Sequence, residues 1–115
     1  MKNQLLIDTI QALRNASNES GKAIWKAIAD ELDKSKRRRI VVNLSRIDRH
    51  TQESEVVAVP GKVLAAGTLS KPIKIAAFSF SQGAIEKIEE VKGEYMSLDE
   101  LIASGIEPKQ IRIMK

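Results

Sequence analysis

Basic side chains cluster between positions 34 and 51, in the run KSKRRRIVVNLSRIDRHT, and they point to one kind of chemistry. Seven of the nineteen Lys and Arg residues lie there against the single acid Asp48, so the segment has a formal charge of +6 while the whole chain has +4. Like charges at this density repel one another unless counter-charges arrive from outside, and a polyphosphate backbone supplies them. The segment therefore favours RNA or DNA as a partner.

A solvated linker is the competing interpretation, because a run of like charges is often only an extended, water-exposed connection. Apolar residues between positions 40 and 47 follow the run, and they predict that its far end is anchored on a core. Asn43 or Ser45 is expected to begin a short helical turn there. Arg46 and Arg49, three positions apart, would then share one face of that turn. An anchored basic loop holds phosphates better than a free tail does.

Catalysis would need a nucleophile paired with a base, or carboxylates in a dry pocket. His50 is the only histidine and there is no cysteine, which excludes a thiol nucleophile, a disulfide and a cysteine or histidine metal cluster. Gly61 and Lys62 resemble the end of a phosphate-binding loop, but Val56 and Val63 stand where that motif has glycine and a hydroxyl. We expect no enzyme, no cofactor, no metal and no small-molecule substrate. A small phosphate-handling enzyme is the least favoured alternative.

The length of 115 residues, with 43% hydrophobic and 30% charged residues, fits one compact domain over residues 1–115. It divides into a helical part at 1–33, the basic stretch at 34–51 and a strand-rich part at 52–115. No apolar run approaches the roughly 20 residues needed to cross a bilayer, and the start lacks the features of a signal peptide. We therefore expect a cytoplasmic protein without a membrane partner.

The first part predicts a helical hairpin. Residues 3–17 carry apolar side chains at spacings of three and four, and the Asn, Ser and Gly cluster at 15–21 predicts a turn. Ser20 is a candidate N-cap for a second helix that ends near residue 33. Trp25 could stack on a base, but its apolar neighbours favour a place in the core.

The last part predicts an α/β fold with a partly parallel sheet. Pro60 and Gly61 are expected to form a turn between two strands, Gly93 to be the left-handed residue that ends a helix, and Ser97 with Glu100 to form a capping box. Strands are expected at 56–59, 63–67, 73–78, 94–96 and 111–113, helices at 82–92 and from 98 to about 105, and core positions at Val57, Val59, Ile75, Ala77, Ile85 and Ile88.

Three segments resemble one family. VNLSRIDRHT at 42–51, VAVPGKVLAAGTL at 57–69 and AAFSFSQGAIEKIEE at 76–90, in this order after a basic linker, are similar to the large-subunit ribosomal proteins of archaea and eukaryotes numbered eighteen-e, and the short chain is similar to the archaeal form. The resemblance implies an α/β fold shared with bacterial ribosomal protein fifteen: a helical hairpin followed by an irregular layered superhelix of strands and helices.

The resemblance also implies a function: a structural constituent of the large ribosomal subunit in the cytoplasm. Its partners would be large-subunit rRNA and neighbouring ribosomal proteins, and no homo-oligomer is expected. The alternative is an RNA-binding module that acts off the ribosome. The implied RNA-binding residues are Lys34, Lys36, Arg37, Arg38, Arg39, Asn43, Arg46, Arg49, His50 and Lys62. The cations would contact chiefly phosphates, while Asn43 and His50 would contact riboses or bases.

Overall fold

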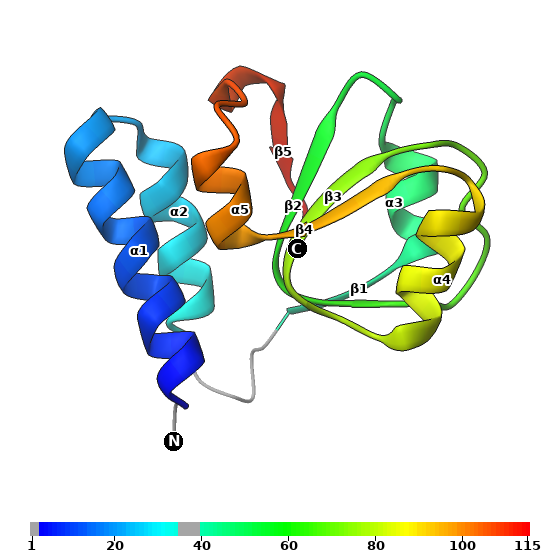
Figure 1. Cartoon of the computed structure of the whole chain (residues 1–115), viewed down its shortest axis with the longest axis horizontal. Helices are drawn as coiled ribbons and strands as arrows, with labels where there is room; N and C mark the ends of the chain where they lie inside the picture. The colour runs from blue at the N-terminus through cyan, green and yellow to red at the C-terminus, as the bar shows by residue number, and fades with distance from the viewer. Residues whose placement is uncertain (1–2, 35–39) are drawn as a thin grey trace.

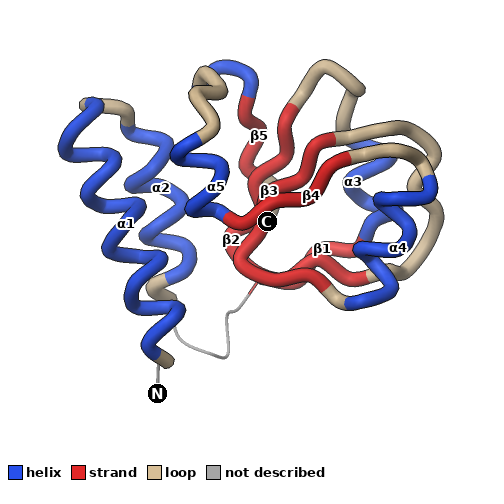
Figure 2. Tube along the Cα trace, in the orientation of Figure 1, coloured by secondary structure: helices blue, strands red, loops and turns tan. Residues whose placement is uncertain are grey.

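The computed structural model describes residues 3–34 and 40–115, in which helices lie on both sides of a central sheet (Figure 1). The elements are α1 (Gln4–Ser20), α2 (Ala23–Leu32), β1 (Ile40–Asn43), α3 (Leu44–His50), β2 (Val56–Leu64), β3 (Lys74–Phe80), α4 (Gln82–Glu90), β4 (Glu94–Ser97), α5 (Leu98–Ala103), the 3-10 turn η2 (Pro108–Gln110) and β5 (Ile111–Ile113). α1, α2 and α5 lie on one side, and α3 and α4 on the other (Figure 2). The predicted α/β class is confirmed.

The helical hairpin is present, but its turn is shorter than predicted. Asn3 caps α1, because its side chain accepts a 2.8 Å hydrogen bond from the N–H of Leu6, and the helix continues to Ser20. The predicted turn over 15–21 and the N-cap at Ser20 are therefore wrong, because Ser20 Oγ donates back to the carbonyl of Ala16 at 2.7 Å. The left-handed Gly21, with φ of 72°, ends the helix.

The sheet is parallel in every pairing of the described strands. β2 pairs with β3 along one edge, while β1 and β5 share its other edge: β5 lies beside Val56–Ala58 and β1 beside Gly61–Leu64. β3 pairs with β4 on its far side. A parallel sheet needs cover on both faces, which the two helical layers provide.

The expected turn at Pro60 and Gly61 is wrong, because β2 runs through both residues. The register with β3 shifts between Val59 and Lys62, and this irregularity accommodates a proline that has no N–H to donate. Gly61 is required by a close approach: a Cβ there would overlap the carbonyl oxygen of Ile40 in β1.

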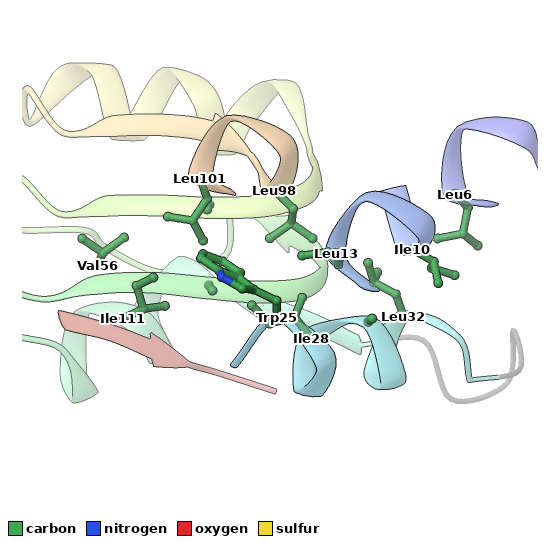
Figure 3. Close-up of a cluster of buried hydrophobic side chains, with 13 residues drawn as sticks. Leu6, Ile10, Leu13, Trp25, Ile28, Leu32, Val56, Leu98, Leu101 and Ile111 are labelled. Carbon is green, nitrogen blue, oxygen red and sulfur yellow. The ribbon is translucent and has the colours of Figure 1, made fainter. Parts of the chain in front are cut away.

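The core has two halves, one on each face of the sheet. On the face covered by α1, α2 and α5, Trp25 is 5% exposed and lies between Leu13, Leu98 and Leu101 (Figure 3), which confirms its predicted place in the core. On the α3 and α4 face, Val57, Val59, Ile75, Ala77 and Ile88 are buried as predicted.

Ile85 is the exception among the predicted core residues, since it is only half-buried. Ala84 and Ile88, four positions apart, turn to the sheet, and Ile85 therefore lies at the side of α4.

The end of α4 differs from the prediction. Lys92, with φ of 61°, is the left-handed residue, and Gly93 is not. A Cβ on Gly93 would lie 2.7 Å from the carbonyl oxygen of Ile73, so glycine is needed there for a close backbone approach. The capping box of α5 is confirmed, because Ser97 and Glu100 exchange two 3.0 Å hydrogen bonds.

Candidate nucleic-acid interface

α3 holds three of the candidate RNA-binding residues that the structure describes. It begins directly after Asn43, as expected, and buries Leu44 and Ile47 against the sheet. Arg46, Arg49 and His50 are exposed on its outer side. The alternation of apolar and basic residues in LSRIDRH therefore fixes which side chains reach solvent.

An acid on the same helix is turned away from these cations. The carboxylate of Asp48 accepts hydrogen bonds from the N–H of Ser70 at 3.0 Å and from its hydroxyl at 2.9 Å. The bond from the Ser70 N–H is the largest cause that lowers the pKa of Asp48, with further contributions from the Ser70 hydroxyl and Lys71. Lys71 Nζ also donates to the carbonyl of Thr51 at 2.8 Å, which ties down the end of α3.

The other end of α3 is held by the loop after β2. The N–H of Ser45 donates to the carbonyl of Ala66 at 3.2 Å, and Gly67 packs so closely on Ser45 that a Cβ would overlap its side chain. Lys87 of α4 stabilises this loop by donating to the carbonyls of Ala65 and Gly67, both at 2.7 Å. The basic face of α3 is therefore presented from a rigid support.

The C-terminal segment, β5 and the residues after it, brings two further cations to α3. Arg112 and Lys115 line an open groove of about 240 Å³ together with Arg46 and His50. Neither residue was among the RNA contacts predicted from the sequence. The alternation of Ile111, Arg112 and Ile113 indicates from the sequence that the arginine faces outward. Its position beside α3 depends on the pairing of β5 with β2, a long-range contact that this local pattern does not specify.

Two acids partly neutralise this group. Arg112 Nη1 lies 3.7 Å from a carboxylate oxygen of Glu55. Glu31 in α2 takes a 2.6 Å hydrogen bond from Lys115 Nζ and lies 2.9 Å from Lys34 Nζ. These bonds, first from Lys115 and then from Lys34, lower the pKa of Glu31. Lys34 is thus held beside the groove residues by a shared carboxylate.

The remaining described candidates lie on the strands β1 and β2. Lys62 is exposed on β2 opposite Val41 of β1, and it lines an apolar-walled pocket of about 170 Å³ that also touches Glu31. Asn43 is half-buried, and its side chain does not cap α3. Lys36, Arg37, Arg38 and Arg39 lie outside the described residues.

Comparison with known proteins identifies the chain's relatives. A sequence profile of the family described as "Ribosomal proteins 50S-L15, 50S-L18e, 60S-L27A" matches residues 7–96. The chain belongs to this family. Two proteins, each named large ribosomal subunit protein eL18, show the similarity. The one from Methanothermobacter thermautotrophicus is 42% identical over 98% of this chain and 93% of its own length. The one from Haloarcula marismortui is 42% identical over 98% of this chain and 97% of its own length.

Membership of the L15, L18e and L27A family confirms the resemblance drawn from the three sequence segments. The family is one of structural ribosomal proteins, so the expectation of a protein that is not an enzyme is confirmed. The eL18 relatives are named as proteins of the large ribosomal subunit, which agrees with the expected localisation.

Residues 3–34 and 40–115 hold no group of three or more histidines and carboxylates placed to bind a metal ion. Within the same ranges no helix combines the length and apolar character needed to span a bilayer. The assignment of individual RNA-binding residues stays a prediction.

Proposed function

We propose that the protein is a structural constituent of the large ribosomal subunit, and that it binds large-subunit rRNA with α3 and the adjoining C-terminal strand. It acts as a single domain over residues 1–115, beside neighbouring ribosomal proteins. The names of the eL18 relatives support the ribosomal role. The observation that carries the proposed RNA contact is the groove where Arg46, His50, Arg112 and Lys115 meet.

The geometry of this groove suits a phosphate backbone. Arg46 and Arg112 come from two elements far apart in the sequence, and their guanidinium groups can each donate two parallel hydrogen bonds to a phosphate. Because α3 is tied to the loops on both sides, little backbone freedom is lost on binding. The acid on α3, Asp48, is directed to Ser70 and leaves the groove positive.

Salt dependence of binding tests the proposal, since each neutralised phosphate releases counterions. Binding to large-subunit rRNA fragments is measured between about 50 and 200 mM salt for the wild type and for the double variant Arg46→Ala with Arg112→Ala. The variant should bind more weakly, and its slope of log K against log salt should fall by roughly one to two units.

The matched control removes the same charge elsewhere. Lys22 precedes α2 and Lys109 lies in η2, and both are exposed. The double variant Lys22→Ala with Lys109→Ala should leave the slope nearly unchanged. An equal change in both double variants would show that only net charge matters, and the α3 surface would then be rejected as the site.

The alternative of an RNA-binding module off the ribosome is separated by a second measurement. The native protein is followed through sedimentation of ribosomal particles from its own cells. The proposal expects it to travel with the large subunit in high salt. Recovery only in the slowly sedimenting fractions would favour the off-ribosome alternative.

A further inference from the structure

β4, which connects α4 to α5 (Figure 2), has one open edge. It pairs with β3, and no other described strand pairs with it. The N–H of Glu94 donates to the carbonyl of Ile73 at 3.2 Å, so the alternation of a strand directs the N–H and C=O of Tyr95 to the open side. The N–H of Ser97 is already bonded to Glu100. Tyr95 therefore offers one main-chain donor and one acceptor at the edge.

An open groove of about 460 Å³ follows this edge. Its lining residues are Glu89, Gly93, Glu94, Tyr95, Met96, Glu100 and Ser104. Three of them are acids and none is basic. Tyr95 is 43% exposed. Its ring packs edge-on against the ring of Phe80, with the ring centroids 5.6 Å apart. The groove therefore combines an exposed aromatic ring, main-chain hydrogen-bonding groups and negative charge.

The charge around β4 has the opposite sign to that of the α3 surface. Residues 86–100 contain six acids and two lysines, in a chain whose net charge is +4. Lys87 is held by the carbonyls of Ala65 and Gly67, and Lys92 is exposed. Lys74 of β3 reaches Glu94 only at 4.0 Å, with both side chains more than half exposed. A polyphosphate would be repelled here, whereas a basic partner is matched.

We propose that the open edge of β4 binds an extended segment rich in Lys and Arg from another protein, as an added strand. Its main chain bonds to Tyr95, and its alternate apolar side chains rest on the Tyr95 ring on one face of the sheet. Its basic side chains lie on the other face beside Glu94, and Glu89 adds to the negative charge of the groove. A second copy of this chain fits less well, because pairing two such edges brings acid against acid. This partner surface is separate from the proposed RNA surface and does not rest on it.

The test uses the full chain and a synthetic decapeptide in which Lys or Arg alternates with Val. Peptide affinity is measured by NMR titration, together with hydrogen exchange at the Tyr95 amide. We expect saturable binding and exchange at Tyr95 slowed at least about tenfold, as an added hydrogen bond requires. The same peptide with Glu in place of each basic residue should not bind.

Charge reversal supplies the matched variants. Glu89→Lys with Glu94→Lys should weaken peptide binding by about tenfold or more, whereas Glu86→Lys with Glu90→Lys, exposed on α4 but outside the groove, should weaken it by about threefold or less. A peptide N-methylated at alternate residues should lose binding even to the unaltered protein, because it cannot donate to the edge.

Several results would overturn the inference. One is no binding at about 1 mM peptide, and another is equal weakening by both double variants. Binding that leaves the Tyr95 exchange rate unchanged would show attraction without strand addition. Concentration-dependent dimers that protect Tyr95 without peptide would assign the edge to a second copy.

Discussion

Lys115 Nζ lies 2.6 Å from Oε1 of Glu31 and so joins the end of the chain to α2, 84 positions earlier. The other carboxylate oxygen of Glu31 lies 2.9 Å from Lys34 Nζ. The Glu31 side chain is only 14% exposed, while that of Lys115 is 55% exposed. One carboxylate therefore orients two cations on the edge of the sheet where the proposed RNA groove lies.

Replacing this carboxylate should alter the pH dependence of stability. The two lysines lower the pKa of Glu31 in the folded protein, so its stabilisation is present above the pKa of the unfolded chain and is lost as the pH falls through the folded pKa. Glu31→Gln should lower the free energy of unfolding at pH 7 by no more than about 1 kcal/mol, because the lysines are exposed. Near pH 3 the difference from wild type should shrink.

Urea unfolding at both pH values measures this effect. Glu53→Gln, which changes an exposed carboxylate in the loop after α3, is the control and should show little difference at either pH. A loss for Glu31→Gln that is the same at pH 3 as at pH 7 would mean that the contribution of Glu31 is not ionic.

The secondary structure was largely readable from the sequence because each signal is local. The period of the apolar residues located α2 and α4, and the Ser97 to Glu100 spacing located the start of α5. The error at Pro60 and Gly61 instead has a long-range cause. Pro60 and Gly61 usually mark a turn, but here β1 and β3 hold both sides of β2 and carry the strand through them.

The candidate site was readable only in part, for the opposite reason. Arg46 and Arg49 follow from the pattern of one short helix. Arg112 reaches the groove that Arg46 lines because β5 pairs in parallel with β2, and nothing in the period of a three-residue strand specifies which strand it joins. The shared carboxylate of Glu31 is likewise a contact between distant segments.

The buried face of α4 should carry much of the stability of its half of the core. Ile88→Ala removes a fully buried side chain and should lower the free energy of unfolding by about 2–5 kcal/mol. Ile85→Ala on the same helix is the control, and its loss should be clearly smaller because Ile85 is half-buried. Denaturant titration of both variants makes the comparison. Equal losses would contradict the orientation of α4 described above.

Gly67 should be needed for the position of α3. Its φ is +83°, and a Cβ would overlap Ser45 in the first turn of that helix. Gly67→Ala should therefore destabilise the protein by more than the roughly 1–2 kcal/mol expected for a left-handed alanine, and should weaken RNA binding by displacing Arg46.

Gly105 provides a matched control for that substitution. It has a similar φ of +78°, but a Cβ there meets nothing within 4 Å. Gly105→Ala should lose only the conformational part, with RNA affinity unchanged. Thermal or denaturant unfolding and RNA titration of both variants test the difference. If the two variants lose equal stability, the contact between Gly67 and Ser45 does not fix α3.

The arginines at 37–39 lie outside the described residues, and their role rests on the sequence. If each neutralises about one phosphate, replacing all three with Ala should weaken rRNA binding strongly and flatten the salt slope by roughly two units or more. Lys62→Ala, which removes one exposed charge, should change the slope by less than about one unit. Folding of both variants should be almost unchanged, because a surface charge leaves no cavity when it is removed. A triple variant with wild-type affinity and slope would show that the basic stretch is a linker, and would direct the search for contacts to Lys22 and Lys26 on the helical hairpin.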